Sequence, residues 1–166
     1  MDMEIVTTGQ KQIFLHSGML FVRKGEYKIV TVLGSCVSVC LWDPAMKMGG
    51  INHYLLPLWN GEGLPSPRYG NIAIAKLIEN MLSKGSKERN LKAKVFGGSS
   101  TANITRGLLS VGKRNIILAL DVLKDRGIPI ISSDVGGTFG RKLIFNTESG
   151  TVLVKKIKIS GNGKHQ

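Results

Sequence analysis

The sequence predicts a mixed α+β (α/β) domain, a layered sandwich of mixed β-sheets with two main helices packed on them. Three observations lead to this prediction. Short β-branched and apolar runs fill the first half of the chain, two later stretches carry apolar residues at helical spacing, and further strand-like runs separate and follow them. Many strands combined with two separated helices are typical of helices packed on sheets.

Strand-like runs dominate the first half of the chain. These runs cover residues 19–23, 27–33, 36–42 and 49–56, and a Gly- and Pro-rich loop follows over 58–70. The third run alternates, so that Val37, Val39 and Leu41 face one way while Cys36 and Cys40 face the other. This alternation predicts a strand, and Asp43-Pro44 ends it.

Two helices are predicted, over residues 71–85 and 114–127, because apolar residues recur there at intervals of three and four. Asn71 and Asn115 are the candidate N-caps, and Gly85 and Gly127 are placed to end the helices. A strand over 93–98 separates the two helices.

Three more strands are predicted after the second helix. They cover residues 128–135, 141–147 and 151–159, and the last two flank Glu148-Ser149-Gly150 as a hairpin. A chain of 166 residues without repeats or an interdomain linker predicts one domain over 1–160, with a disordered tail over 161–166.

The net charge of +12 indicates partners that are polyanions or acidic proteins, and the alternative is that it serves solubility alone. Nucleic acid is the weaker of these, because aromatic residues make up only 6% of the chain and no helix-turn-helix, zinc-finger or RNP pattern occurs. No apolar run reaches the roughly 18 residues of a membrane span, and the acidic N-terminus does not resemble a secretory signal. The sequence therefore predicts a cytoplasmic protein with reduced thiols and no membrane insertion.

Cys36 and His53 form the candidate reactive pair. Gly34-Ser35 precedes Cys36, and a glycine before a nucleophile lets the backbone turn sharply and direct N–H groups toward a substrate oxygen. His53 follows 17 residues later in a strand-like run that could pair with the cysteine strand. An adjacent imidazole can take the proton of a thiol and activate it as a nucleophile.

Other interpretations of these residues stay open. Cys40 fits an ordinary core position, and His53 could equally be a hydrogen-bonded core histidine. Four steps along a strand separate the two cysteines by about 13 Å, which disfavours both a disulfide and a zinc site. The glycine pairs in "FGGSST" and "DVGGTFGRK" lack a complete nucleotide-binding fingerprint, so close backbone approach around a site explains them better. We expect no metal and no cofactor.

Five segments together carry a resemblance to a known family. They are "LGSCVSVCLWDP", "GGINHYLLP", "KVFGGSS", "VGKRN" and "DVGGTFGRKLIFNTESG". In this order, over roughly residues 12–159, they resemble CheD, the family of chemoreceptor glutamine deamidases. That family is similar in turn to the deamidase domain of bacterial cytotoxic necrotizing toxins, which implies a layered αβ sandwich with a Cys–His pair and a third polar residue.

The resemblance implies a role for three residues. Cys36 matches the nucleophile, His53 matches the general base, and Thr31 is the candidate third member, five residues before Cys36. The spacer between this threonine and the cysteine differs by one residue among family members. A one-residue change turns a strand side chain to the opposite face unless a bulge absorbs it.

The resemblance also implies a reaction and partners. The reaction is conversion of receptor glutamine side chains to glutamate through a thioester, as part of chemotaxis adaptation. The partners are the cytoplasmic domain of a methyl-accepting chemoreceptor and the phosphatase CheC, with the chain itself a monomer. The alternative is a non-catalytic module that docks CheC or receptors, and nucleic-acid binding is a third, weaker class.

Overall fold

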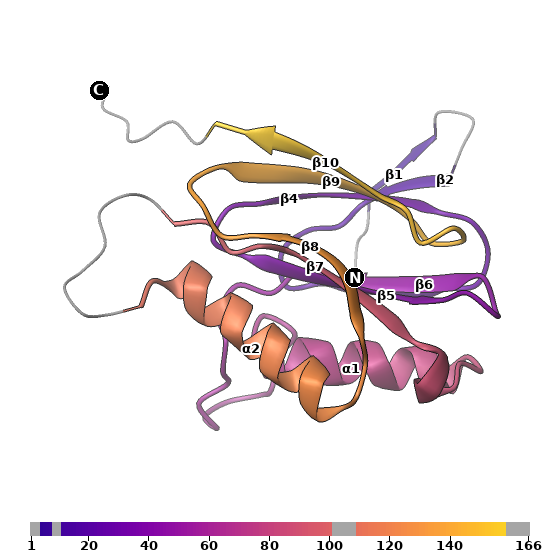
Figure 1. Ribbon diagram of the computed structural model, residues 1–166, viewed down its shortest axis with the longest axis horizontal. Coiled ribbons are helices and arrows are strands. Elements are labelled where there is room, and N and C mark those ends of the chain that lie inside the picture. Colours follow the sequence, from indigo (N-terminus) through magenta and orange to yellow (C-terminus); the bar gives the residue numbers. More distant parts are fainter. Residues whose placement is uncertain (1–3, 8–10, 101–108, 159–166) are drawn as a thin grey trace.

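The computed structural model describes residues 4–7, 11–100 and 109–158 of the chain. Two five-stranded sheets are stacked face to face, and two helices cover the outer face of one of them (Figure 1). The layered α+β sandwich predicted from the sequence is confirmed. The predicted tail, residues 161–166, lies outside the described residues.

The two sheets are named sheet A and sheet B. Sheet A has the order β1 (Glu4–Thr7), β2 (Lys11–Phe14), β4 (Lys28–Leu33), β9 (Gly140–Asn146), β10 (Val152–Ile157). Sheet B has the order β3 (Leu20–Arg23), β6 (Met48–Asn52), β5 (Val37–Asp43), β7 (Lys92–Gly97), β8 (Ile130–Val135). Both sheets are mixed, because β2 pairs with β4 and β7 with β8 in parallel, while the other pairs are antiparallel.

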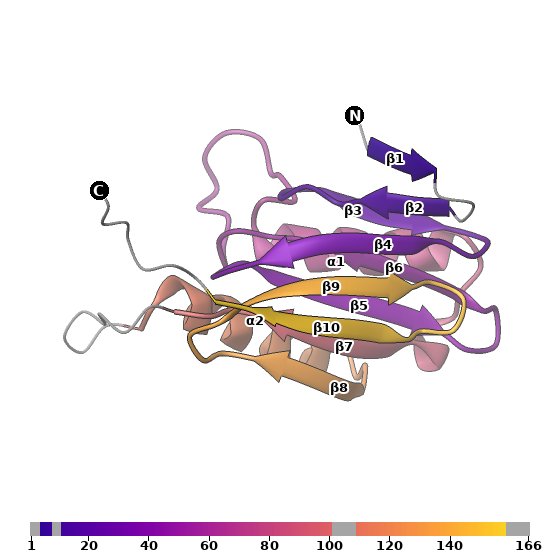
Figure 2. The same cartoon turned by 90° about the horizontal axis from the view of Figure 1, so that it is seen from above.

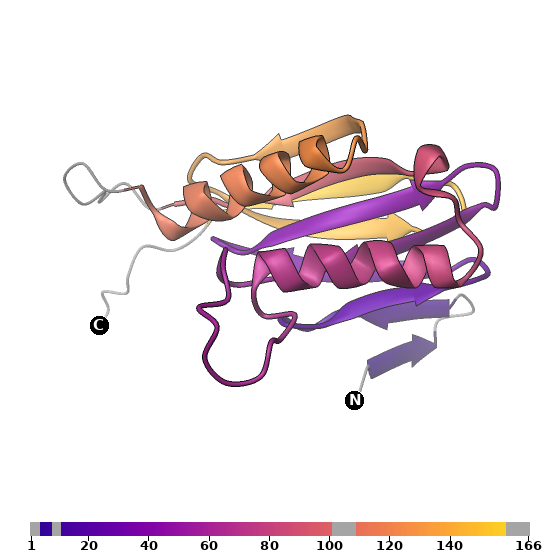
Figure 3. The same cartoon turned by 90° about the horizontal axis from the view of Figure 1, so that it is seen from below.

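Helices α1 (Gly70–Ser83) and α2 (Val111–Asp125) lie side by side over sheet B (Figure 3). A short 3₁₀ helix, η1 (Glu88–Asn90), follows α1. Neither helix is long and apolar enough to cross a bilayer, and this statement covers the part of the chain that the structure describes.

Sheet B has an apolar core on each of its faces. Val37, Val39 and Leu41 of β5 face the helices, whereas Cys40 faces sheet A, so the predicted alternation is confirmed. Figure 2 shows sheet A lying over sheet B, with the second core between them. A side chain near the ends of these strands can therefore reach from one sheet to the other.

Both predicted N-caps are wrong. Helix α1 begins one residue before Asn71, and the Asn71 Oδ1 accepts a hydrogen bond from the Trp59 N–H instead. Helix α2 begins at Val111, where Ser110 is the cap and accepts from the Lys113 N–H. Asn115 lies inside α2 and is fully buried. Both helices begin upstream of their predicted starts, at residues that the apolar spacing of three and four did not mark.

The strand predictions are confirmed in the second half of the chain, including the hairpin between β9 and β10. The sequence interpretation missed β1, β2 and η1, which are four residues or shorter. It also did not assign the runs 19–23 and 27–33 to separate sheets. In the structure β3 joins sheet B and β4 joins sheet A.

Candidate active site

Thr31 and His53 are joined by a buried hydrogen bond that links the two sheets. The Thr31 Oγ1 lies 2.8 Å from the His53 Nδ1 and donates to the Leu15 carbonyl at 2.7 Å. A hydroxyl has one proton to give, so with that proton on Leu15 it accepts from an Nδ1–H of the imidazole. This arrangement selects the neutral tautomer whose Nε2 is unprotonated and able to accept a proton.

Thr31 faces the interior of the molecule, although the length of the spacer between it and Cys36 left its direction open. Ile29, Thr31 and Leu33 all face inward from β4 and are buried, while Val32 between them is 45% exposed. The strand ends at Leu33, and the bend over Gly34 and Ser35 separates it from β5. Because that bend lies between two strands, the spacer length does not decide which way Thr31 points.

His53 follows directly after β6 and is held by its backbone. Its N–H donates to the Met19 carbonyl at 3.1 Å, and its carbonyl accepts from the Gly18 N–H at 2.7 Å. Burial lowers the pKa of His53 to about 4, and the nearby His16 contributes to this lowering. The imidazole is therefore neutral near pH 7, as a general base must be.

Cys36 lies on the same face as His53, one step from a strand bridge. Val37 and Tyr54 exchange two backbone hydrogen bonds, of 3.1 and 3.0 Å, which makes them a directly paired couple. Cys36 and His53 each precede one member of that antiparallel couple and are diagonal neighbours, at a typical Cα separation of about 7–8 Å. Cys36 packs against the core between the sheets, on the side from which His53 reaches Thr31.

The thiol and the imidazole are uncharged in the resting site. Burial raises the pKa of the Cys36 thiol. No hydrogen bond joins Cys36 to His53 among the described residues, so the structure brings His53 and Thr31 into direct contact and places Cys36 beside them.

The bend before Cys36 presents backbone donors. Within the described residues, neither the Ser35 N–H nor the Cys36 N–H donates a hydrogen bond. The Cys36 carbonyl already has a partner, because it accepts a hydrogen bond from the Gly98 N–H at 2.8 Å. Two free N–H groups beside a thiol can bind a carbonyl oxygen as it becomes negative.

Gly97 allows the end of β7 to approach the cysteine bend. Its φ is +105°, and a Cβ at this position would lie 2.3 Å from the Cys36 carbonyl oxygen. The sequence interpretation of this glycine pair as a site of close backbone approach is confirmed. Strand β7 ends at Gly97, and residues 98–100 follow it without regular secondary structure.

Two polar residues that support the site were missed from sequence. Asn115 donates from Nδ2 to the Ser35 and Leu55 carbonyls, both at 3.0 Å. Arg141, only 3% exposed, donates to Asp134 at 3.1 Å and to the Gly136 carbonyl at 2.9 Å. The signal for both was available, because each is a polar residue at an apolar position of a periodic run.

Cys40 has the properties of a core residue. It is 1% exposed within the core between the sheets, and burial raises its pKa strongly. Among the described residues no group of three His, Cys, Asp or Glu side chains could hold a metal ion. Cys36, Cys40 and His53 are thus not gathered around one point.

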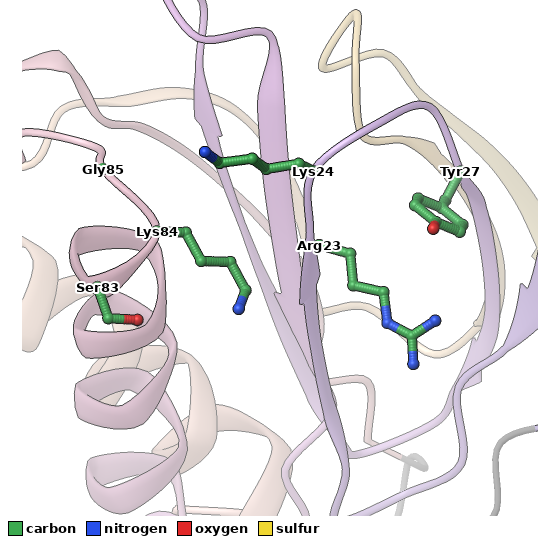
Figure 4. A pocket seen from close by; sticks show the side chains of 6 residues that line it. All are labelled: Arg23, Lys24, Tyr27, Ser83, Lys84 and Gly85. Carbon is green, nitrogen blue, oxygen red and sulfur yellow. The ribbon is translucent and has the colours of Figure 1, made fainter.

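Two surface hollows differ in their relation to these residues. One, of about 460 Å³, adjoins the cysteine bend through Gly98 and is lined further by Leu109, Lys113 and Ile116. The other, of about 630 Å³, lies between the β3–β4 turn and the end of α1 (Figure 4). We call it the basic hollow, and its lining residues are Arg23, Lys24, Tyr27, Ser83, Lys84 and Gly85.

The fold and the candidate site together define a class of protein. A two-sheet α+β sandwich holds a half-buried thiol beside a neutral imidazole whose tautomer is set by a threonine hydroxyl. This arrangement suits acyl transfer by a cysteine nucleophile.

Comparison with known proteins identifies the family. The family model described as CheD chemotactic sensory transduction matches residues 55–156. A relative from Sulfurimonas denitrificans is 50% identical over 147 residues, which cover 87% of this chain and 94% of the relative. Another, from Trichlorobacter lovleyi, is 46% identical and covers 94% of this chain and 93% of the relative. Both carry the name probable chemoreceptor glutamine deamidase CheD. The chain belongs to the CheD family.

A solved structure, the Bacillus licheniformis hypothetical protein YfiH, matches with a TM-score of 0.43 and 16% identity. The match covers 66% of this chain and 49% of that one. Such a distant likeness adds nothing to what the site itself indicates.

Proposed function

We propose that the chain, folded as one domain over residues 1–160, is a protein-glutamine deamidase that converts glutamine side chains of chemoreceptors to glutamate. The names of its relatives support this function. The observation that carries it is the buried Thr31–His53 hydrogen bond, which leaves Nε2 as an acceptor on the face shared with Cys36. In this proposal Cys36 is the nucleophile, His53 the general base and acid, and Thr31 the residue that orients the imidazole.

The first half of the reaction forms a thioester. The Cys36 sulfur attacks the carbon of the glutamine carboxamide while His53 takes the thiol proton on Nε2. The amide oxygen becomes negative and is bound by the free N–H groups of Ser35 and Cys36. Protonated His53 then gives its proton to the nitrogen, the C–N bond breaks, and ammonia leaves.

The second half releases the product. Water attacks the thioester carbon while His53 takes a proton from that water, and the carbon–sulfur bond then breaks. The receptor side chain leaves as glutamate and Cys36 regains its proton. Burial keeps the His53 pKa low, so the imidazole is neutral at the start of both halves and, once protonated, gives its proton readily to the leaving nitrogen.

The hollow that includes Gly98 is a candidate surface for the receptor segment. The hollow at Gly98 adjoins the cysteine bend and combines apolar Leu109 and Ile116 with the amine of Lys113. This lining suits a helical segment that bears both apolar and acidic side chains. The net charge of +12 favours encounter with an acidic receptor or with CheC, the second proposed partner. In this proposal the chain acts as a monomer in the cytoplasm.

Mass spectrometry of a receptor cytoplasmic fragment tests this function. The fragment is incubated with the full chain, and each deamidation is expected to add about 1 Da because NH₂ is replaced by OH. The Cys36→Ala variant serves as the matched control for contaminating activity. An unchanged receptor mass after incubation with the wild-type chain at equimolar concentration would contradict the proposal.

One observation favours the second candidate, a non-catalytic module that docks receptors or CheC. Burial raises the pKa of the Cys36 thiol, and its sulfur makes no hydrogen bond to His53 among the described residues. A thiol in that state is a weak nucleophile until a substrate rearranges it. Wild-type chain that binds the receptor without changing its mass, with binding that Cys36→Ala leaves unchanged, would favour docking over catalysis.

A further inference from the structure

Asn115 contacts both segments that carry the candidate reactive pair. Its Nδ2 donates to the carbonyl of Ser35, the residue before Cys36, and to the carbonyl of Leu55, two residues after His53. Both distances are 3.0 Å. Since both partners are carbonyl oxygens, only the amide nitrogen can face them, and the orientation of the side chain is settled by its surroundings.

These bonds replace the strand ladder at the point where it stops. Val37 and Tyr54 form the last directly bonded couple, and beyond it Leu55 donates its N–H to the Arg68 carbonyl instead. The carbonyls of Ser35, two residues before Val37, and of Leu55, directly after Tyr54, bond to one amide from α2. The two diverging segments are thus held by a single side chain.

Asn115 is itself held by the segment that it contacts. The Tyr54 hydroxyl donates to the Asn115 backbone carbonyl at 2.6 Å, and both residues are fully buried. Asn115 therefore contacts Tyr54, the residue after His53, through its backbone and Ser35, the residue before Cys36, through its side chain.

Stability alone does not account for an asparagine here. Asparagine is a weak helix former, and Asn115 occupies the buried face of α2 together with Ala119 and Leu123. Its Oδ1 is buried without a hydrogen-bond partner among the described residues, which is unfavourable for folding. A buried polar residue with such a cost is expected where it serves a functional site.

We propose that Asn115 is a positioning residue that sets the separation between the Cys36 thiol and the His53 imidazole. This inference rests on the Cys36–His53 pairing of the proposed function. By holding the Ser35 and Leu55 carbonyls on one amide, Asn115 keeps the cysteine bend and the histidine segment at one spacing. A shift of about 1 Å between such groups is enough to slow a reaction about a hundredfold.

Alkylation of Cys36 by iodoacetamide, followed as a function of pH, tests the separation without a receptor. In the wild-type chain the alkylation rate should contain a component that follows the protonation of His53, because the imidazole takes the thiol proton. His53→Ala supplies the profile of an unassisted thiol. Asn115→Ala should shift the wild-type profile toward that of His53→Ala and lower the rate at pH 7 by about tenfold.

A double variant asks whether Asn115 acts through the pair. If it does, adding Asn115→Ala to His53→Ala should slow alkylation less than twofold further, because the assistance is already gone. In receptor deamidation, Asn115→Ala should lower kcat about tenfold or more with KM nearly unchanged. The reason is that Asn115 does not line the hollow at Gly98, the proposed surface for the receptor segment.

Two further variants and one control guard against a folding defect. Asn115→Ser keeps one donor, and Tyr54→Phe removes only the contact that holds Asn115, so both should give intermediate profiles in a well-folded chain. Ala119→Gly, one turn along the same buried face of α2, should lower the melting temperature by about 2–6 °C and leave the alkylation profile unchanged.

The outcomes separate this inference from the proposed function. A lowered melting temperature with a wild-type alkylation profile in Asn115→Ala and Asn115→Ser overturns the positioning role, whether or not receptors are deamidated. An alkylation profile that His53→Ala does not alter instead overturns the Cys36–His53 pairing, and this inference with it. A shifted alkylation profile in a chain that leaves the receptor mass unchanged supports the positioning role and contradicts only the deamidase function.

Discussion

The two ends of helix α1 lie in regions of opposite character. At its start, Gly70 packs against Tyr54 beside the candidate site, where Thr31, His53 and Asn115 are buried and hydrogen-bonded. At its end, about 21 Å away for a helix of 14 residues, the basic hollow exposes cationic side chains (Figure 4). The ion pairs found in the described part of the chain involve none of them.

This difference suggests separate contributions of the two ends to the proposed deamidation: positioning of groups at the start of α1 and receptor encounter at its end. The buried end has little charge, so its hydrogen bonds are shielded from water and hold groups at set distances. The exposed basic hollow holds no group in place, but its charge acts over roughly 10 Å at 0.1 M salt and can raise the rate of encounter. Substitutions at the first end should change turnover, whereas substitutions at the second should change association.

The largest effect is expected for Cys36, the proposed nucleophile. Cys36→Ala should lower receptor deamidation by about 10⁴-fold or more while the chain stays folded, because the side chain is only half-buried and makes no hydrogen bond among the described residues. Cys40→Ala is the matched control, and it should cost about 1–2 kcal/mol of stability with near-normal turnover. The comparison fails if the two variants exchange these results when turnover and thermal unfolding are measured together.

The next effect is expected for the hydroxyl that orients His53. Thr31→Val should lower kcat by about tenfold or more, because the imidazole loses the bond that selects its tautomer. It should also cost about 1–3 kcal/mol, since the Leu15 carbonyl is left buried and unpaired.

Thr31→Ser keeps the hydroxyl and is the control for that loss. It should restore most of kcat, although the missing methyl leaves a small cavity. Equal kcat values for the valine and serine variants would show that the hydroxyl does not orient the base.

A third effect concerns pH and stability. The folded chain holds the pKa of His53 at about 4, below the ordinary value near 6.5. Above pH 6.5 the imidazole is neutral in both states, and between pH 6.5 and 4 only the unfolded chain takes up the proton. The free energy of unfolding should therefore fall by roughly 3 kcal/mol over this range.

Denaturant unfolding at several pH values measures this slope. His53→Gln should remove the part of the slope that belongs to this residue. His16→Ala should make it slightly smaller, because His16 is the second cause of the lowered pKa. A wild-type slope that His53→Gln leaves unchanged would mean that other groups control the acid response.

The sequence predicted the layers because they depend on local patterns, and the roles of Cys36 and His53 stay a prediction. Alternation along residues 36–42 places Cys36 and Cys40 on one face, and Gly34-Ser35 marks the bend before Cys36. Asn115 was predicted as a cap because asparagine before an apolar run is typical of helix starts. Its true partners, Ser35 and Leu55, are 80 and 60 residues away, and a local pattern carries no information about contacts of that range.

The basic hollow should give the smallest effect, and it tests the other half of the comparison. Replacing Arg23, Lys24 and Lys84 by Gln removes three positive charges from one place. Because steering acts on encounter, kcat/KM for receptor deamidation should fall about two- to fivefold at low salt, with kcat unchanged. The difference from wild type should shrink as salt is raised toward 1 M, where the Debye length is about 3 Å.

A matched triple variant separates a local docking surface from the total charge. Replacing Lys142, Lys155 and Lys156 by Gln removes the same charge from exposed positions on β9 and β10. A smaller loss of kcat/KM in this control would assign receptor encounter to the basic hollow, whereas equal losses would assign it to net charge. Nucleic-acid binding predicts a different result, an affinity for DNA that falls linearly in log salt with several phosphates neutralised. Submicromolar DNA binding at physiological salt, together with deamidation that salt does not alter, would contradict steering of receptors by the basic hollow and favour nucleic acid as its partner.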